Sequence, residues 1–197
     1  MDRAENQGML NKPLPAIDEP EGDYVPVRQS YIVDAHVHLF PNNLFTPIRQ
    51  WFEIHGWPIR YQLSSEDIIQ FLNSHGIDHI VALHYAHKPG IARKLNSYMA
   101  EISRSHPQVT AMATVYPGEE DAVAILEQAF QDGLAGVKLH NHVQCFDINS
   151  PAMKEIYDIC SRSRKPLIMH VGREPKSPAY RCDPYELCRA DMVERVL

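Results

Sequence analysis

The strongest constraint on the fold of this sequence is a strand pattern and a helix pattern that alternate five times. Short apolar runs rich in Val, Ile, Leu and Ala recur along the chain, as expected for strands buried on both faces. A helical pattern follows each run, which predicts parallel βα units. The apolar runs cover residues 31–38, 79–84, 109–116, 134–140 and 166–172.

Start and stop signals mark the predicted helices. Ser64 or Ser65 is a suitable N-cap for the first helix, and Gly76 is a suitable end. Ser150-Pro151 combines a cap with proline at the first helical position. The helices are predicted over about residues 64–76, 91–105, 119–131, from 151 onward, and 184–197.

The spacing of the strands predicts an α/β fold of the TIM-barrel, (β/α)8 type. The five strands begin on average about 34 residues apart, so eight units need roughly 270 residues. With 197 residues, the chain is expected to contain only about the first five units. Its open strand edges then need further chain or a partner to cover them. An open doubly wound sheet is the alternative, but no Gly-rich turn follows the first strand.

Composition limits the function classes and the domain organisation. The net charge of −6 and the lack of Lys/Arg runs give no support for a nucleic-acid partner. No apolar stretch is long enough to cross a bilayer and no signal sequence is recognisable, so a cytoplasmic protein with free cysteines is expected. Residues 1–30 are polar and contain four prolines, which predicts a flexible arm before one barrel region at 31–197.

The first predicted strand ends in two histidines. Because side chains alternate along a strand, Asp34, His36 and His38 share one face, which is expected to point into the barrel. The apolar residues that alternate with them, from Val33 to Val37, are expected to pack against helices. Two imidazoles at the carboxyl end of a strand can converge on one metal ion.

Two later strands carry further polar side chains on the inward face. Lys138 and His140 belong to the fourth strand, and either a salt bridge to Asp34 or a functional role accounts for a lysine inside a barrel. Of His140 and His142 at the mouth, one is expected to be a plain loop histidine. His170 ends the fifth strand at the same level as the first-strand pair, which predicts a third metal ligand.

The motifs Asp34–His38, Gly136–His140 and Met169–Gly172 together resemble the amidohydrolase superfamily. The similarity is greatest to the amidohydrolase-related branch, which includes hydrolases and non-oxidative decarboxylases. It covers about residues 31–175 and continues to the end of the chain with less distinct motifs. The family also uses a histidine on strand six and an aspartate on strand eight, and this chain contains neither strand.

The resemblance implies a divalent metal, Zn²⁺ or Mn²⁺, held by His36, His38 and His170. In binuclear members a carboxylated lysine bridges two metals, and Lys138 stands at that position. In mononuclear members Lys138 would contact the substrate instead, and both alternatives remain open. Lys138 and His140 are therefore assigned to catalysis.

The expected activity is hydrolysis of an amide, ester or lactone bond in a small molecule by a metal-activated water. The alternatives are metal-dependent decarboxylation of an aromatic or enoic acid, and a barrel fragment that binds metal without turnover. Tyr116, at the end of the third strand, and Arg173, after the fifth, are candidate substrate contacts. Exposed strand edges also suggest a homo-oligomer.

Overall fold

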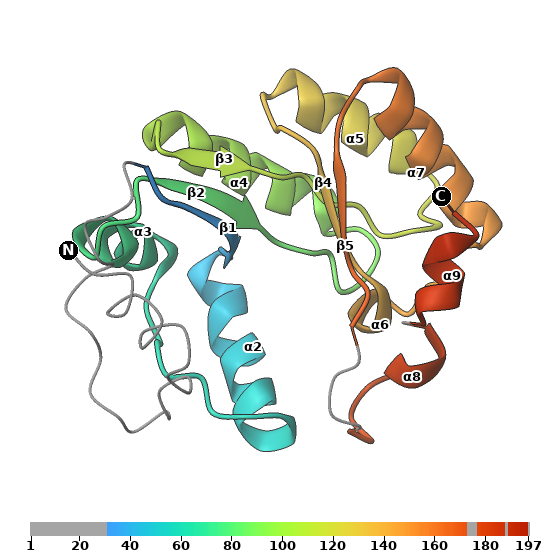
Figure 1. The fold of residues 1–197 in the computed structure, drawn as a ribbon, viewed down its shortest axis with the longest axis horizontal. Helices are drawn as coiled ribbons and strands as arrows, with labels where there is room; N and C mark the ends of the chain where they lie inside the picture. Colours follow the sequence, from blue (N-terminus) through green and yellow to red (C-terminus); the bar gives the residue numbers. More distant parts are fainter. Residues whose placement is uncertain (1–30, 173–176, 188, 197) are drawn as a thin grey trace, which may run out of the picture.

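A computed structural model of the chain describes residues 31–172, 177–187 and 189–196 (Figure 1). The predicted N-terminal arm, residues 1–30, lies outside the described residues, and so does Arg173. Within the described part of the chain, no helix is long and apolar enough to cross a membrane.

All five predicted strands are present and all their pairings are parallel. β1, β2 and β3 form one ladder in chain order, and β4 pairs with β5. Ala113 joins the two ladders through a parallel bridge to Val137, where the Lys138 amide donates to the Ala113 carbonyl at 2.7 Å. The strands therefore follow one another in space as they do in sequence, as in the first five units of a TIM barrel. Their bounds are β1 Val33–His38, β2 His79–Leu83, β3 Val109–Ala111, β4 Val137–His140 and β5 Leu167–His170.

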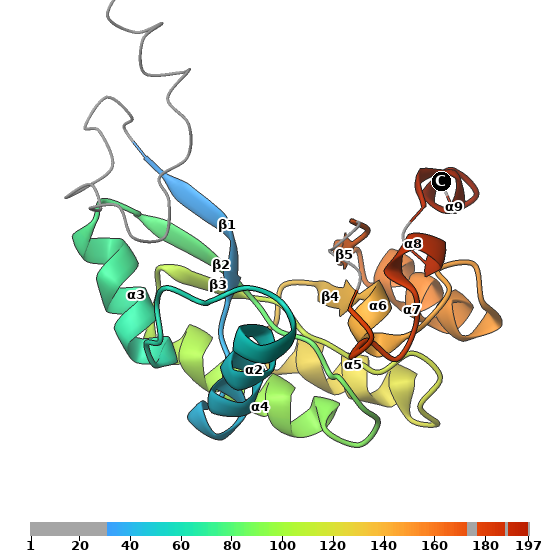
Figure 2. The ribbon, with the colours of Figure 1, turned by 90° about the horizontal axis from the view of Figure 1, so that it is seen from below.

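Helices α3, α4, α5 and α7 lie on one face of the sheet (Figure 2). Their buried faces pack against the strands and form the core, as in the outer ring of a barrel. Shorter helices follow the carboxyl ends of β4 and β5. The helix bounds are α2 Asn42–His55, α3 Ser65–Ser74, α4 Ala92–Ser105, α5 Ala122–Gln131, α6 Asn141–Gln144, α7 Pro151–Arg162, α8 Pro184–Leu187 and α9 Ala190–Glu194.

The predicted helix starts are confirmed for α3 and α7 and shifted for α5. Ser64 forms a capping box with Asp67 at the start of α3, and α7 begins at Pro151. α5 begins at Ala122 instead of Glu119. The Glu119 carboxylate accepts hydrogen bonds from the Tyr116 amide at 2.9 Å and from the Gly90 amide at 2.8 Å, so this residue closes a turn before the helix.

Two segments differ from the sequence-based expectation. α2 occupies the stretch after β1, where no helix was predicted, and it contains Pro47 in its interior. Proline inside a helix removes a backbone hydrogen bond, so its presence argued against a helix in the sequence. The last predicted helix is divided into α8 and α9, because Arg189 has an extended backbone with ψ near 143°.

The expected packing of the apolar face of β1 is correct only for Val37. Val33 is 45% exposed and Ala35 is also exposed. The pairing with β2 shifts between Asp34 and Val37, where β1 has an extra residue relative to its partner. A bulge interrupts the two-residue alternation, so the simple two-face interpretation of this strand is wrong.

At Gly136, just before β4, other segments of the chain approach the backbone closely. A Cβ at this position would lie 2.3 Å from Met112 Cε and 2.5 Å from the carbonyl oxygen of Pro166. The second contact is to backbone, which cannot move aside as a side chain can. Only glycine therefore lets β4 pack at this level.

We expect Gly136→Ala to lower the free energy of unfolding by about 3 kcal/mol or more, because the new methyl group clashes with fixed atoms. Gly90→Ala is the control. Gly90 has a φ of 82°, but a Cβ there would meet no atom within 4 Å, so only the backbone penalty of about 1 kcal/mol applies. Denaturant unfolding of both variants measures the difference, and equal losses would contradict the close-approach argument.

Candidate metal centre

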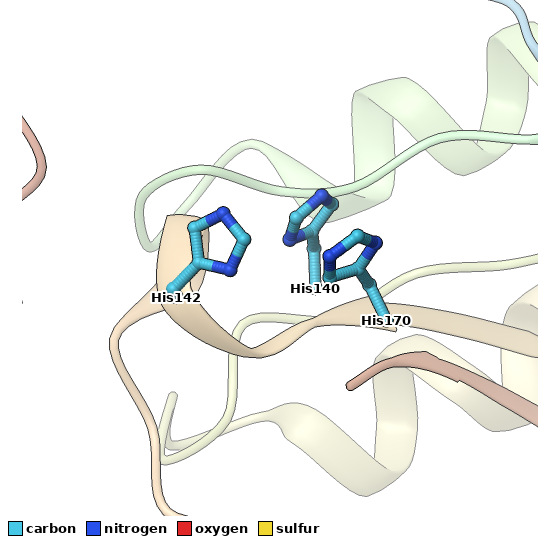
Figure 3. A group of neighbouring side chains, drawn as sticks. All are labelled: His140, His142 and His170. Carbon is cyan, nitrogen blue, oxygen red and sulfur yellow. The ribbon is translucent and has the colours of Figure 1, made fainter. Parts of the chain in front are cut away.

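Three histidines gather at the carboxyl ends of β4 and β5 (Figure 3). His140 and His170 are the last residues of the two strands and are paired in register. Their rings stack with centroids 4.2 Å apart. His142 comes from α6, and its ring lies 4.6 Å from that of His140 and 5.2 Å from that of His170. We call these three residues the histidine triad.

The nitrogen atoms of the triad lie close enough together to hold a metal ion. One ligand nitrogen from each ring lies within 4.8 Å of the other two, and His140 and His142 are buried. Nitrogen ligands bind Zn²⁺ at about 2.0–2.1 Å, so small side-chain movements are enough to bring all three to one ion. His140 Nδ1 is buried and has no hydrogen-bond partner among the described residues. An unpaired buried nitrogen beside two other imidazoles fits a metal ligand.

His36 and His38, the predicted first-strand ligands, form a pair of their own. Their Nε2 atoms are 3.2 Å apart, and neither belongs to the compact triad. The Tyr85 ring connects the pair with the triad, since its centroid lies 5.6 Å from that of His38 and 4.9 Å from that of His140. Of the predicted ligand set, only His170 is in the triad.

Burial keeps histidines of the site neutral. Mainly through loss of hydration, with further repulsion from Lys138 and neighbouring imidazoles, the pKa of His38 falls to about 3. The pKa of His140 is also well below its ordinary value, again chiefly because of burial. Only a neutral imidazole can donate a nitrogen lone pair to a metal. These residues are therefore ready to bind a cation at neutral pH without first losing a proton.

Lys138 lies completely buried next to these histidines. Its Nζ has no hydrogen-bond partner among the described residues, so the expected bond to Asp34 is not formed. Asp34 Oδ1 instead accepts from the amide of His36 at 3.0 Å. Burial lowers the pKa of Lys138 to about 8. A buried amine without a partner is costly, which is more typical of a functional group than of a structural one.

A buried polar network supports the strand ends below the site. Asn96, on α4, accepts from the amide of Thr114 at 2.8 Å and donates to its carbonyl at 2.9 Å. The Thr114 hydroxyl donates to the carbonyl of Lys138 at 2.9 Å. His84 Nε2 donates to Asn96 Oδ1 at 3.1 Å, which fixes its neutral tautomer. The carboxyl ends of β2, β3 and β4 are thus tied together.

An apolar pocket of about 440 Å³ lies beside the triad, with His142 in its wall. Trp51 and Phe52 from α2 line one side, and Tyr180 packs on both Trp51 and His142. Among the described residues that line the pocket, Lys88 and Arg181 are cationic and none is Asp or Glu. The pocket therefore suits a small, largely apolar anion.

Of the two predicted substrate contacts, only Tyr116 is among the described residues, and it does not line this pocket. Tyr116 follows β3 and is partly buried against the core, outside the pocket lining. Arg173 lies outside the described residues. Sequence reasoning missed Tyr85 and took one of His140 and His142 for a plain loop residue. The His-Asn-His spacing at 140–142 repeats that of His36 and His38 and was the available signal.

Comparison with known proteins agrees with this fold and shows the family. The amidohydrolase family matches residues 33–192. Because this match spans most of the chain, the protein belongs to the amidohydrolase family. No curated protein matches the sequence.

Solved structures with the same fold include one described as an amidohydrolase and others described as decarboxylases. One, described as an amidohydrolase II, has 20% identity and a TM-score of 0.58, with 75% of this chain and 53% of that chain covered. The 5-carboxyvanillate decarboxylase of Novosphingobium aromaticivorans, complexed with manganese and 4-hydroxy-3-methoxy-5-nitrobenzoic acid, has 16% identity and a TM-score of 0.60, with coverages of 85% and 58%. That of Sphingomonas paucimobilis has 15% identity and a TM-score of 0.52, with coverages of 72% and 52%.

The chain spans about half the length of these solved structures. This agrees with the partial (β/α)8 barrel seen in the strand order. The family to which the chain belongs includes hydrolases and decarboxylases, and the histidine triad could hold a metal ion.

We expect replacement of His140, His142 or His170 by Ala to weaken Zn²⁺ binding by on the order of 100-fold, because each removes one ligand nitrogen. His79→Ala is the control, since His79 lies at the start of β2 and bonds to Thr110. Calorimetric titration with Zn²⁺ measures the affinities. Wild-type affinity in the triad variants would contradict the assignment.

Acid should destabilise the fold through His84. Burial lowers its pKa to about 4, against 6.5 when unfolded, so the unfolded chain binds the proton more readily between these pH values. Stability is then lost as the pH falls from 6.5 towards 4, by up to about 3 kcal/mol. His84→Gln retains a donor for Asn96 without titrating, and denaturant unfolding at several pH values should show a smaller acid loss. An unchanged acid loss would contradict this.

Proposed function

We propose that the protein is a metal-dependent hydrolase that cleaves an amide, ester or lactone bond of a small anionic molecule. The observation that carries the proposal is the triad of converging histidines, one of which, His142, also lines an apolar pocket. Hydrolysis requires only a metal, a water molecule and a substrate carbonyl, which is less than the other activities of the family require. Zn²⁺ is the expected metal, with Mn²⁺ as the alternative.

The protein's own residues would have separate roles. The triad would hold one divalent ion, and His36 and His38 would complete its coordination or hold a second. When bound, the metal would polarise the scissile carbonyl and lower the pKa of a water molecule. The wall formed by Trp51 and Tyr180 would exclude bulk water and orient the apolar part of the substrate.

Lys138 is proposed to meet negative charge at the centre. Its buried amine lacks a hydrogen-bond partner among the described residues, so a substrate oxygen or a carboxylated form of the lysine would remove the cost of burying it alone. His140 lies two residues after Lys138 on the same strand. If the metal is held by the other histidines, His140 is proposed to hold or transfer a proton.

Decarboxylation is the second candidate, and the pocket is the observation that favours it. Lys88 and Arg181 can hold the carboxylate of an aromatic acid, while the aromatic walls hold its ring. The manganese-containing relative is complexed with a nitrobenzoic acid, which is a ligand of this shape and charge.

Product analysis separates the two reactions from metal binding without turnover. The protein is loaded with Zn²⁺ or Mn²⁺ and incubated with aromatic esters, lactones and hydroxybenzoic acids. Hydrolysis yields a new acid, and only decarboxylation releases carbon dioxide. Turnover by the wild type that needs the metal supports an enzyme, whereas metal binding with no product from either substrate class supports the non-catalytic alternative.

We expect Lys138→Met to lower kcat/KM by on the order of 100-fold with little loss of stability, because methionine fills the space without the amine. Lys165→Met is the matched control. Lys165 donates to the Leu134 carbonyl near the amino ends of β4 and β5, away from the histidines at their carboxyl ends. Equal activity of wild type and Lys138→Met would remove this lysine from the mechanism.

A further inference from the structure

We propose that Gln144 is a positioning residue that sets the geometry of the metal centre. The inference rests on the proposed function, because it concerns the same site. It goes beyond that function by assigning a role to a residue that binds neither metal nor substrate. No motif in the sequence marks this residue.

The Gln144 side chain is fully buried and uses both ends of its amide on backbone groups. Its Oε1 accepts from the amide of His140 at 2.7 Å. Its Nε2 donates to the carbonyl of Ala86 at 3.0 Å and to that of Val115 at 2.8 Å. One side chain thus joins the segments that follow β2, β3 and β4.

Two of these contacts touch a part of the site. His140 is a member of the triad, and its own backbone amide is held. Ala86 follows Tyr85, whose ring lies between His38 and His140. Movement of either segment would change the distances between these rings. Gln144 therefore holds the residues whose relative placement makes the site.

The local structure explains how Gln144 reaches this position. α6 is a single turn that starts directly after β4, and Cys145 ends it with a left-handed φ of 53°. This turn carries His142 on one side and directs Gln144 back under the strand ends. His142 and Gln144 are two residues apart on the same turn, so a shift of one displaces the other. The glutamine thus fixes both triad residues that come from 140–142.

A neighbouring amide gives a matched comparison. Asn96 is also buried and makes two bonds to Thr114, but it contacts no triad residue. Removal of either amide leaves buried backbone groups without partners and should cost similar stability. Asn96 acts on the strand ends through Thr114, whereas Gln144 bonds directly to a triad residue, so removal of Gln144 should change the metal geometry and removal of Asn96 should not.

The test uses Gln144→Met, Gln144→Glu and Asn96→Leu. Methionine has similar length and no strong hydrogen bond, whereas glutamate retains the acceptor for His140 and loses both donors. Co²⁺ serves as the probe, because its visible spectrum reports ligand number and geometry. We expect Gln144→Met to weaken Co²⁺ binding at least tenfold and to change the spectrum, as loss of support around metal ligands does elsewhere.

Gln144→Glu should restore part of the affinity, and Asn96→Leu should keep the wild-type spectrum despite its lower stability. A wild-type spectrum and affinity in Gln144→Met would overturn the proposal. An equal change in Asn96→Leu would also overturn it, because the effect would then follow stability alone.

Amide hydrogen exchange tests the same clamp without metal. The His140 amide should exchange at least tenfold faster in Gln144→Met and remain protected in Asn96→Leu. Unchanged protection would contradict the role of Gln144. If the wild type bound no metal at all, the proposed function would fail, while this exchange measurement would still decide on Gln144.

Discussion

The parallel, in-register pairing of β4 with β5 is the constraint on which the site depends. It places His140 opposite His170 at the ends of the two strands, so their rings stack at 4.2 Å. Because parallel strands all end on the same side of the sheet, Lys138 and the first-strand histidines reach the same region. The chemistry of the site thus follows from strand direction before any loop contributes.

Burial gives these side chains their properties. In water a histidine is partly protonated near neutral pH, and a lysine is fully charged. Here the pKa of His38 falls to about 3 and that of Lys138 to about 8, in both cases mainly through burial. The sheet therefore holds neutral nitrogen ligands next to an amine that has no hydrogen-bond partner among the residues described. Both conditions favour binding of a cation and of a substrate anion.

Much of the fold could be predicted from the sequence, because its signals are local. Apolar runs located all five strands, and Ser64 and Pro151 marked helix starts correctly. Pro47 hid α2, since proline in a helix violates the usual pattern. The bulge in β1 also could not be foreseen, because it depends on pairing with β2.

The site was predicted less fully, because distances between strand ends are not local. The alternation of side chains along β4 and β5 was enough to predict that His140 and His170 lie on the inward face of their strands. The contribution of His142 depends on the single turn of α6, and that of Gln144 on three backbone groups from separate segments.

Zinc-edge X-ray absorption of the Zn²⁺-loaded protein tests directly whether the histidine triad is the metal centre. We predict at least three imidazole ligands at about 2.0 Å from the metal. Fewer than three imidazole ligands would contradict a centre built on the histidine triad.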